Sequence, residues 1–357
     1  MEKLFWNKIS NAVRLTESII YTLVEGKNVL LSLSEYIPWY NIFRDQVEEL
    51  QRQELGGYGI DFYEDSVNDD PGYMLFMEYC KKELKDDYRP AIGYARFLAN
   101  AESIPLNNSI VWVKVESDKR VKEWCDFITK YNKELKNEFS GGLFIVETLC
   151  DISGISFEGG KSVKYSDYIG EFDYYIYSTL ASSVLNIEKH RKEYLAEMVT
   201  SILGNDIELS ALCLADDRYK KFWEDPQKTI NDIISEQTRS DGEEFSFALN
   251  NEGVKQRIWK AQIKNLFPLI EAYRGGFVKK YFVSIEKMLP ISSSYGEEFA
   301  KPYEVEIGTL YYMACNGDIE VDSQDLKQLK CFKEARNKLA HIEVLSVKEI
   351  EDLFTYL

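Results

Sequence analysis

Short apolar runs alternate with longer segments of helical spacing through the first half of the chain. Residues 28–33 form an apolar run behind Gly26, which is typical of a buried strand. Residues 109–115 are rich in branched and aromatic side chains and form the clearest strand of the chain. Further strands are predicted at 60–63, 142–147 and 172–177, and helices at 38–54, at 71–102 with an interruption at Pro90, and at 117–138. This alternation predicts a mostly parallel α/β sheet covered by helices on both faces.

Helical spacing dominates the second half. Residues 186–245 predict a small helical lid or linker, whose polar part, 235–244, is the best linker candidate. Helices are then predicted at 254–274, at 277–289, at 302–314, from Asp322 to about His341, and from a capping box at Ser346 to the end. The fold class is therefore multidomain, α/β plus all-α. The predicted domains are 1–185 (α/β), 186–245 (lid or linker) and 246–357 (a helical bundle).

Charge restricts where a nucleic acid would bind. The chain of 357 residues has a net charge of −17, whereas a free-standing nucleic-acid-binding domain is usually basic. An RNA site must therefore be a local basic patch. Basic residues do cluster in 255–287 and again in 327–338, where Lys330, Lys333 and Lys338 are the candidate RNA-binding side chains. The alternative is that these lysines are ordinary solvated helix faces.

Several classes of protein are not expected from this composition. The six cysteines form no C-x-x-C pair, which indicates reduced thiols in a cytoplasmic protein rather than a zinc site or disulfide framework. His190 has no histidine or cysteine neighbours, so we predict no metal site and no cofactor. No apolar run approaches the ~20 residues of a membrane span, so no membrane association is expected, and the N-terminus lacks the pattern of a signal peptide.

The order of elements over residues 1–185 resembles a P-loop NTPase core of the AAA/STAND type. A working phosphate loop needs the glycines and lysine of G-x-x-x-x-G-K-[ST] after the first strand. The segment Ser32-Leu-Ser-Glu-Tyr-Ile-Pro-Trp39 contains neither, and the third strand ends in Lys114-Val-Glu116, a poor match to a metal-binding Asp-Glu pair. We therefore expect a degenerate, non-hydrolysing domain that serves as scaffold or sensor, with Glu35 and Glu116 as surface or capping residues.

The candidate chemistry lies in Arg336-Asn337-Lys338-Leu339-Ala340-His341, near the C-terminus. A histidine side chain exchanges a proton near neutral pH, since its unperturbed pKa is about 6.5. An arginine binds phosphate through its planar guanidinium and stays charged. The chain has only two histidines, His190 and His341, and His341 is the better candidate for acid–base chemistry.

Residues 250–357 resemble the HEPN family of ribonucleases and RNA-binding domains, whose hallmark is Arg, a polar residue, and His four to six positions after the Arg. Arg336, Asn337 and His341 match that motif. The resemblance implies metal-independent RNA cleavage that leaves a 2′,3′-cyclic phosphate, with these three residues as the catalytic set. Many HEPN domains paired with nucleotidyltransferase antitoxins carry a tyrosine two positions after the histidine; here that position is Glu343.

Helix geometry also leads us to expect a homodimer. Arg336 and His341 lie about 140° apart on an ideal helix, whereas Asn337 and His341 share a face. Two copies of the C-terminal domain across a two-fold axis would bring both side chains to one phosphate, as HEPN dimers are thought to do. The competing interpretation pairs Arg336 with Glu334 or Glu343 and leaves His341 as a favourable helix end.

Three functions follow from these resemblances. The first is a regulated HEPN endoribonuclease, since the fusion of an NTPase-like part to an HEPN part resembles bacterial antiviral and abortive-infection effectors. The second is a non-catalytic subunit used for assembly or sensing in a defence complex, with protein partners. The third is an active NTPase with an unrecognised site.

Overall fold

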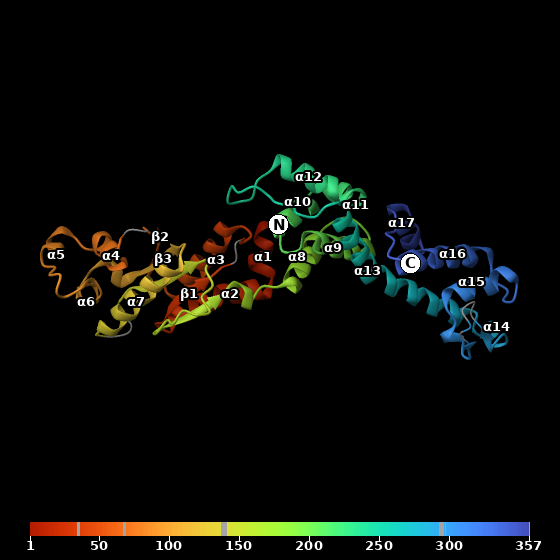
Figure 1. Ribbon diagram of the computed structural model, residues 1–357, viewed down its shortest axis with the longest axis horizontal. Coiled ribbons are helices and arrows are strands. Elements are labelled where there is room, and N and C mark those ends of the chain that lie inside the picture. The colour runs from red at the N-terminus through yellow and green to blue at the C-terminus, as the bar shows by residue number, and fades with distance from the viewer. Residues whose placement is uncertain (34–35, 67–68, 137–140, 293–295, 297, 357) are drawn as a thin grey trace. The chain divides into compact units, whose positions relative to one another are not determined.

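The computed structural model describes residues 1–357 except 34–35, 67–68, 137–140, 293–295, 297 and 357. The chain divides into two compact units, Met1–Asp173 and Tyr174–Leu357, and each is described here by itself (Figure 1). The boundary falls inside helix α8 (Glu171–Ser183). The predicted division into three domains stays a prediction.

Unit 1, Met1–Asp173, is built on a parallel sheet with the strand order β2-β3-β4-β1-β5. The strands are β1 (Asn28–Ser32), β2 (Gly59–Glu64), β3 (Ser109–Val115), β4 (Leu143–Thr148) and β5 (Gly160–Lys164). Every neighbouring pair is parallel, and Leu30 of β1 lies opposite both Val146 of β4 and Ser162 of β5. The predicted parallel α/β sheet is therefore confirmed.

Helices cover both faces of this sheet, as predicted. The helices α1 (Glu2–Lys8), α2 (Ser10–Val24) and α3 (Tyr40–Glu54) contact one another, and Phe43 of α3 packs edge-on against Trp112 of β3. On the other face lie α4 (Pro71–Tyr79), α6 (Tyr94–Asn100) and α7 (Asp118–Glu134), with α5 (Lys82–Asp86) between α4 and α6 in the chain. On that face, Val111 and Val113 of β3 belong to the same buried apolar cluster as residues of α7. Because successive side chains of a strand face opposite ways, a central strand covered on both faces is apolar throughout.

One predicted strand is wrong. Residues 172–177 belong to helix α8, and the fifth strand is β5 in the Gly/Ser-rich stretch before it. Aromatic residues favour strands by propensity, yet here tertiary context selects the helix. β5 lies at the sheet edge and buries only Val163 of its five residues, so it lacks the apolar run that marks a central strand.

The described residues of unit 2, Tyr174–Leu357, are mostly helical. They include one short antiparallel strand pair, β6 (Ile291–Ser292) and β7 (Glu298–Phe299), and an isolated bridge between Thr238 and Glu244. This confirms the predicted helical C-terminal region. Its helices after α8 are α9 (Lys189–Leu203), α10 (Ile207–Leu214), α11 (Arg218–Glu224), α12 (Pro226–Glu236), α13 (Asn251–Lys280), α14 (Phe282–Glu286), α15 (Ile307–Asn316), α16 (Ser323–Ala340) and α17 (Val347–Thr355). The long α13 packs against α9 and α16, and α16 packs against α15 and α17 (Figure 1).

The predicted break near residue 275 is also wrong, because α13 runs without interruption from Asn251 to Lys280. It passes through Pro268 and Gly275-Gly276, residues that are unfavourable inside a helix. Leu266, Ile270 and Phe277 are buried on either side of these positions. Packing of the apolar face therefore outweighs the local preference, as it does for most helices in proteins.

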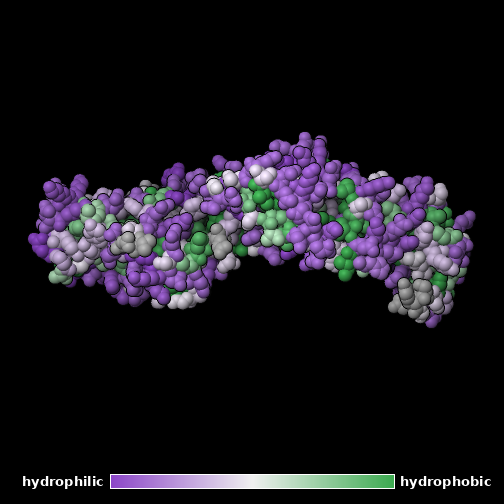
Figure 2. Space-filling model, turned by 45° about the horizontal axis from the view of Figure 1, so that its top comes forward, coloured by the Kyte–Doolittle hydropathy of each residue, from purple (hydrophilic) through white to green (hydrophobic). Residues whose placement is uncertain are grey.

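The polar segment 235–244, the linker candidate, is tied to α10. Arg239 Nη2 donates to Asp206 at 2.7 Å, and the Ser240 hydroxyl donates to Glu208 at 2.6 Å. The face drawn in Figure 2 is mostly hydrophilic with separate apolar patches. Among the described residues, none of the helices combines the length and apolar character needed to cross a bilayer.

Candidate functional site

The end of α16 carries the predicted catalytic residues. The helix begins at a cap in which the Asp322 carboxylate accepts hydrogen bonds from the N–H groups of Gln324 and Asp325, at 3.0 and 2.8 Å. It ends at His341, which is the C-cap residue. Arg336 and Asn337 lie in the last turns before it, so the structure brings all three predicted catalytic residues to one helix end.

The chain turns sharply after His341. Ile342 adopts a left-handed conformation with φ 63°. Its N–H donates to the Leu339 carbonyl at 3.2 Å, and the Glu343 N–H donates to the Lys338 carbonyl at 2.9 Å. These two bonds form a Schellman motif, which normally places glycine or asparagine at the left-handed position. A β-branched residue there is a strained exception.

Helix α13 fixes the backbone on both sides of His341. Trp259 Nε1 donates to the Leu339 carbonyl at 2.9 Å. The buried Gln262 amide forms two bonds with Leu345: its nitrogen donates to the carbonyl at 3.0 Å, and its oxygen accepts from the N–H at 2.8 Å. Sequence analysis missed both residues, because about 80 positions separate them from their partners and no local spacing signals such a contact.

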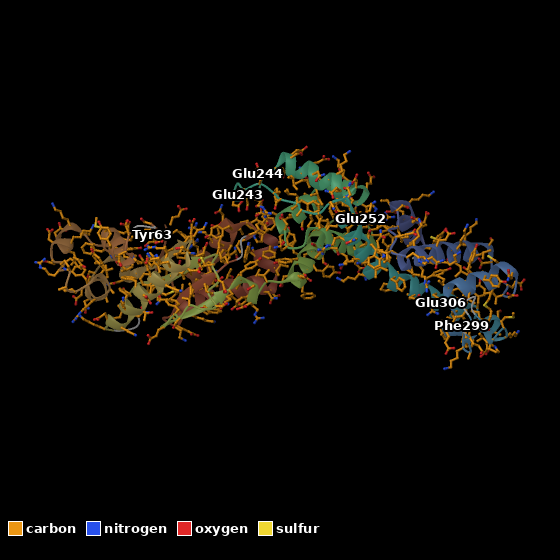
Figure 3. All side chains as sticks on the ribbon, in the orientation of Figure 1. Tyr63, Glu243, Glu244, Glu252, Phe299 and Glu306 are labelled. Atoms are coloured by element: carbon orange, nitrogen blue, oxygen red, sulfur yellow. The ribbon has the colours of Figure 1, made fainter. Side chains whose placement is uncertain are left out.

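The three predicted catalytic side chains differ in exposure. His341 is exposed, whereas Arg336 and Asn337 are half-buried. Arg336 Nη2 lies 3.5 Å from an oxygen of Glu306, which is labelled in Figure 3. The partner of Arg336 is thus Glu306, just before α15, rather than Glu334 or Glu343. Exposed ion pairs of this length contribute about 0–1 kcal/mol, so a phosphate group could displace the glutamate.

Each predicted RNA-binding lysine has a partner on unit 2. Lys330 lies 3.9 Å from Glu334, Lys338 lies 2.6 Å from Glu349, and Lys333 stands 4.4 Å above the ring of Tyr311. The hydrogen bond to Glu349 raises the pKa of Lys338. The helix end is therefore a mixed surface of cations and carboxylates, and RNA binding by these lysines stays a prediction.

The loop after β1, where the sequence lacks the phosphate-loop motif, packs its residues 37–39 into the fold. Ile37, Pro38 and Trp39 are buried directly before α3 begins at Tyr40. Trp6 Nε1 donates to the Pro38 carbonyl at 2.7 Å. A phosphate cradle at this helix N-terminus would need exposed backbone N–H groups. Glu35 lies outside the described residues, and Glu116 is an exposed residue after β3.

Glu147 is a buried carboxylate that sequence analysis treated as part of a plain strand. It accepts hydrogen bonds from the Tyr40 hydroxyl at 2.6 Å and from Trp112 Nε1 at 2.7 Å. Burial raises the pKa of Glu147 above its ordinary value, although these two bonds oppose the shift. The carboxylate joins the start of α3 to β3 and β4, so it helps to hold the buried loop in place.

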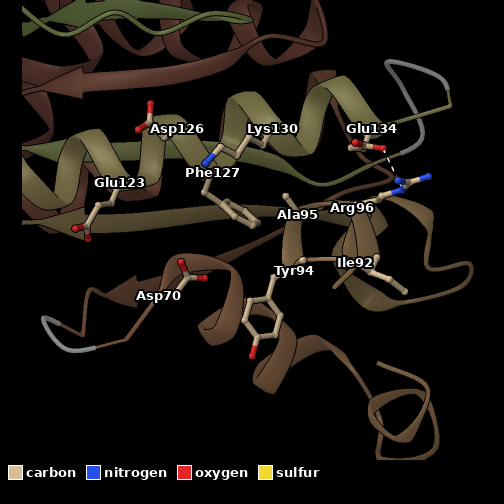
Figure 4. Close-up of a pocket in the computed structure, with 11 residues that line it drawn as sticks. Asp70, Ile92, Tyr94, Ala95, Arg96, Glu123, Asp126, Phe127, Lys130 and Glu134 are labelled. Carbon is tan, nitrogen blue, oxygen red and sulfur yellow. Dashed lines mark ion pairs between the residues drawn. The ribbon is translucent and has the colours of Figure 1, made fainter. Parts of the chain in front are cut away.

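Two cavities have none of the predicted site residues in their walls. Figure 4 shows one of about 500 Å³ in unit 1, beside α6 and α7, with Asp126, Lys130 and the ion pair Arg96–Glu134 on its wall. The other, of about 300 Å³, lies in unit 2 and includes Arg191, Tyr219, Trp223 and Glu351. Within the described part of the chain, no three His, Cys, Asp or Glu side chains are grouped so as to hold a metal ion.

Comparisons with known proteins identify no family. No protein-family model and no curated protein matches the chain. Among solved structures, it is similar to "Replication initiator DnaA bound to AMPPCP and single-stranded DNA", with 13% identity and a TM-score of 0.31 over 98% of this chain and 94% of that one. A likeness this weak carries no argument about the function of this chain.

Proposed function

We propose that the chain is a metal-independent endoribonuclease whose active site is built on the end of α16. The observation that carries the proposal is the exposed imidazole of His341 at a helix end that Trp259 and Gln262 hold in place. Arg336, five residues earlier, provides the cation that such a reaction requires. A fixed position matters because small displacements of a catalytic group lower its effectiveness sharply.

The reaction is an internal transesterification. A neutral His341 imidazole takes the proton from a ribose 2′-OH, and the 2′ oxygen attacks the adjacent phosphorus. The bond from phosphorus to the 5′ oxygen breaks, and that oxygen receives a proton, so the products are a 2′,3′-cyclic phosphate and a 5′-OH. Proton transfer of this kind contributes about 10²–10⁴-fold to a rate. Arg336 neutralises the charge that develops on the phosphorane, and Asn337 orients the imidazole or the phosphate.

Two copies of the chain complete the site in this proposal. One histidine cannot serve as the base and the acid of the same step, whereas a two-fold pair supplies a neutral and a protonated imidazole. The helical separation of about 140° between Arg336 and His341 also favours convergence across a dimer axis. The resemblance to bacterial antiviral and abortive-infection effectors gives the proposed role, in which unit 1 controls the nuclease.

A second candidate function is a non-catalytic subunit of a defence complex, used for assembly or sensing. The observation that favours it is the pairing of the cations on α16, since Lys330, Lys338 and Arg336 all face carboxylates. A third, an NTPase with an unrecognised site, is separated from the others by measuring nucleotide affinity. The buried loop 37–39 argues against it.

The proposal is tested by incubating mixed RNA with the purified full-length chain in EDTA and identifying the product ends. We expect cleavage that leaves 2′,3′-cyclic phosphate and 5′-OH ends. Arg336→Lys keeps the charge but loses the planar fork, so the rate should fall about 10²-fold, comparable to the loss of one donor to a developing oxyanion. Arg52→Lys, at an exposed position of α3 in unit 1, is the matched control and should keep the parent rate. Cleavage that EDTA stops, or equal rates for both variants, would refute the proposal.

A further inference from the structure

A cavity of about 300 Å³ in unit 2 is formed by three segments of the chain. Arg191 comes from the first turn of α9, Tyr219, Lys220, Trp223 and Glu224 come from α11, and Glu351 comes from α17. The volume is at the lower end of the roughly 300–1,000 Å³ of small-molecule sites. It therefore suits a ligand about as large as one nucleobase with its sugar.

One wall of the cavity is aromatic and fixed. Tyr219 and Trp223 are four residues apart on α11, so they share a helix face. The Trp223 ring packs edge-on against the buried Tyr194 at a centroid distance of 5.1 Å, and it also contacts Phe354 at 6.4 Å. An aromatic side chain held in this way offers a stacking surface at little further loss of entropy on binding.

The polar side chains of the cavity provide both donors and acceptors. The guanidinium of Arg191 is held by ion pairs with Glu188 and Glu351. The Nζ of Lys220 lies 2.6 Å from Asp217 and 5.7 Å from the centre of the Tyr219 ring. Glu224 adds an exposed carboxylate from the last position of α11. The cavity thus combines cationic donors, a carboxylate acceptor and an aromatic plane within one small volume.

We propose that this cavity is a subsite for one base of single-stranded RNA, with a preference for guanine. Bases of single-stranded RNA are recognised by stacking on aromatic rings and by hydrogen bonds to their edges. Guanine presents the acceptors O6 and N7, which arginine and lysine recognise. Its N1–H and N2–H₂ donors face the same way and suit a carboxylate such as Glu224. Adenine has no such pair of donors.

The subsite lies close to the proposed catalytic residue along the chain. Val347, which also lines the cavity, is six residues after His341. Six residues span at most about 22 Å, and the Gln262–Leu345 bonds hold the connecting loop. One short oligonucleotide can therefore reach both places. The inference rests on the proposed function to this extent: the bound base would belong to the RNA that His341 cleaves.

The test measures binding separately from cleavage. The full-length chain carrying His341→Ala is titrated into fluorescein-labelled UUUGUUU and UUUAUUU oligoribonucleotides, with fluorescence anisotropy as the readout. We expect the guanine oligonucleotide to bind at least about fivefold more tightly, since one well-made base contact contributes about 1–3 kcal/mol. Tyr219→Ala should weaken its binding at least about fivefold, and Glu224→Gln should remove the preference for guanine.

Two controls keep the result interpretable. Tyr21→Ala removes an exposed tyrosine of unit 1 and should leave both affinities unchanged. Trp223→Phe keeps an aromatic ring for folding and should weaken binding less than Tyr219→Ala does. Equal affinity for the two oligonucleotides, unaffected by Tyr219→Ala and Glu224→Gln, would overturn the inference even if the chain cleaves RNA. A guanine preference in a chain that never cleaves RNA would support the subsite and refute the proposed nuclease alone.

Discussion

Two helix ends of this chain bear on phosphate chemistry, and the structure treats them in opposite ways. The start of α3 is where a P-loop protein binds phosphate although this sequence lacks the motif, and the end of α16 carries the predicted catalytic residues. At the start of α3 the preceding loop is packed with Ile37, Pro38 and Trp39, all buried. At the end of α16, His341 and Ile342 are exposed, while the half-buried Trp259 and the buried Gln262 hold only the backbone. The first end stabilises the fold, and the second leaves its side chains accessible to a ligand.

Both ends include a residue in the left-handed region that is not glycine, namely Trp39 with φ 48° and Ile342 with φ 63°. Such conformations cost about 1–2 kcal/mol for an ordinary residue. Packing of the buried Trp39 side chain offsets that strain. Ile342 is 68% exposed, so its side chain gains little in return. Strain without compensation from packing is typical of functional positions.

The largest expected effect on stability comes from removing a buried side chain of the loop after β1. Trp39→Ala should lower the free energy of unfolding of unit 1 by about 3–5 kcal/mol, as large-to-small substitutions of buried aromatic residues do. Urea unfolding followed by circular dichroism measures this. Met77→Ala, at an exposed position of α4, should change the stability by no more than about 0.5 kcal/mol. Equal stabilities for the two variants would mean that the loop after β1 is not packed as described.

The next largest effect on stability is expected from replacing Gln262, which holds the backbone after the end of α16. Gln262→Leu removes both side-chain bonds to Leu345 and leaves its buried N–H and carbonyl without these partners. Each such loss costs about 1–3 kcal/mol, so unit 2 should be destabilised by at least about 2 kcal/mol. The Leu345 amide should also exchange its hydrogen faster. Gln324→Leu, at an exposed position of α16, is the matched control. Unchanged exchange at Leu345 would contradict this account of the loop.

A smaller effect, a stabilisation instead of a loss of stability, is expected from substituting Ile342. Ile342→Gly relieves the left-handed strain but gives the unfolded chain more freedom, so the net stabilisation should be up to about 1 kcal/mol. Ile342→Val keeps a β-branched residue and should give no stabilisation. The two variants are compared by thermal melting. If the glycine variant melts below the valine variant, the Ile342 backbone is not strained.

The smallest effect is a pH dependence at Glu147. Its pKa is raised by burial, so the folded state holds the proton more tightly than the unfolded state, and this contribution to stability falls as pH rises through the raised pKa. Glu147→Gln does not titrate. The melting temperature of the parent relative to the variant should therefore decline as the pH rises from about 4.3, the ordinary pKa of a glutamate, through the raised pKa of the folded state. A difference that stays constant or grows over that range would show that the carboxylate is not destabilised by burial.

The sequence was sufficient where local pattern and tertiary packing agree. The central strands β1, β3 and β4 are buried on both faces, so they appear as apolar runs and were predicted correctly. The caps at Asp322 and Ser346 were also visible, because the capping residue and its partners lie within three positions. Edge strand β5 and the uninterrupted α13 were missed, since contacts with distant elements determine both.

The candidate site was predictable only in part, for the same reason. Arg336, Asn337 and His341 are recognisable as candidates because they are neighbours in the chain, and their catalytic role stays a prediction. Glu306 is 30 positions from Arg336, and Trp259 and Gln262 are about 80 positions from the backbone they hold. The left-handed Ile342 could not be predicted, because the usual residues at that position are glycine and asparagine.

Catalysis at the exposed end of α16 is best tested by comparing RNA cleavage by two histidine variants. The full-length chain, His341→Ala and His190→Ala are compared on the same RNA in EDTA. His190 is the only other histidine and lies on α9 against Phe354, which makes it the matched control. The account predicts a loss of about 10²–10⁴-fold for His341→Ala and the parent rate for His190→Ala. A His341→Ala variant that cleaves at the parent rate would contradict it.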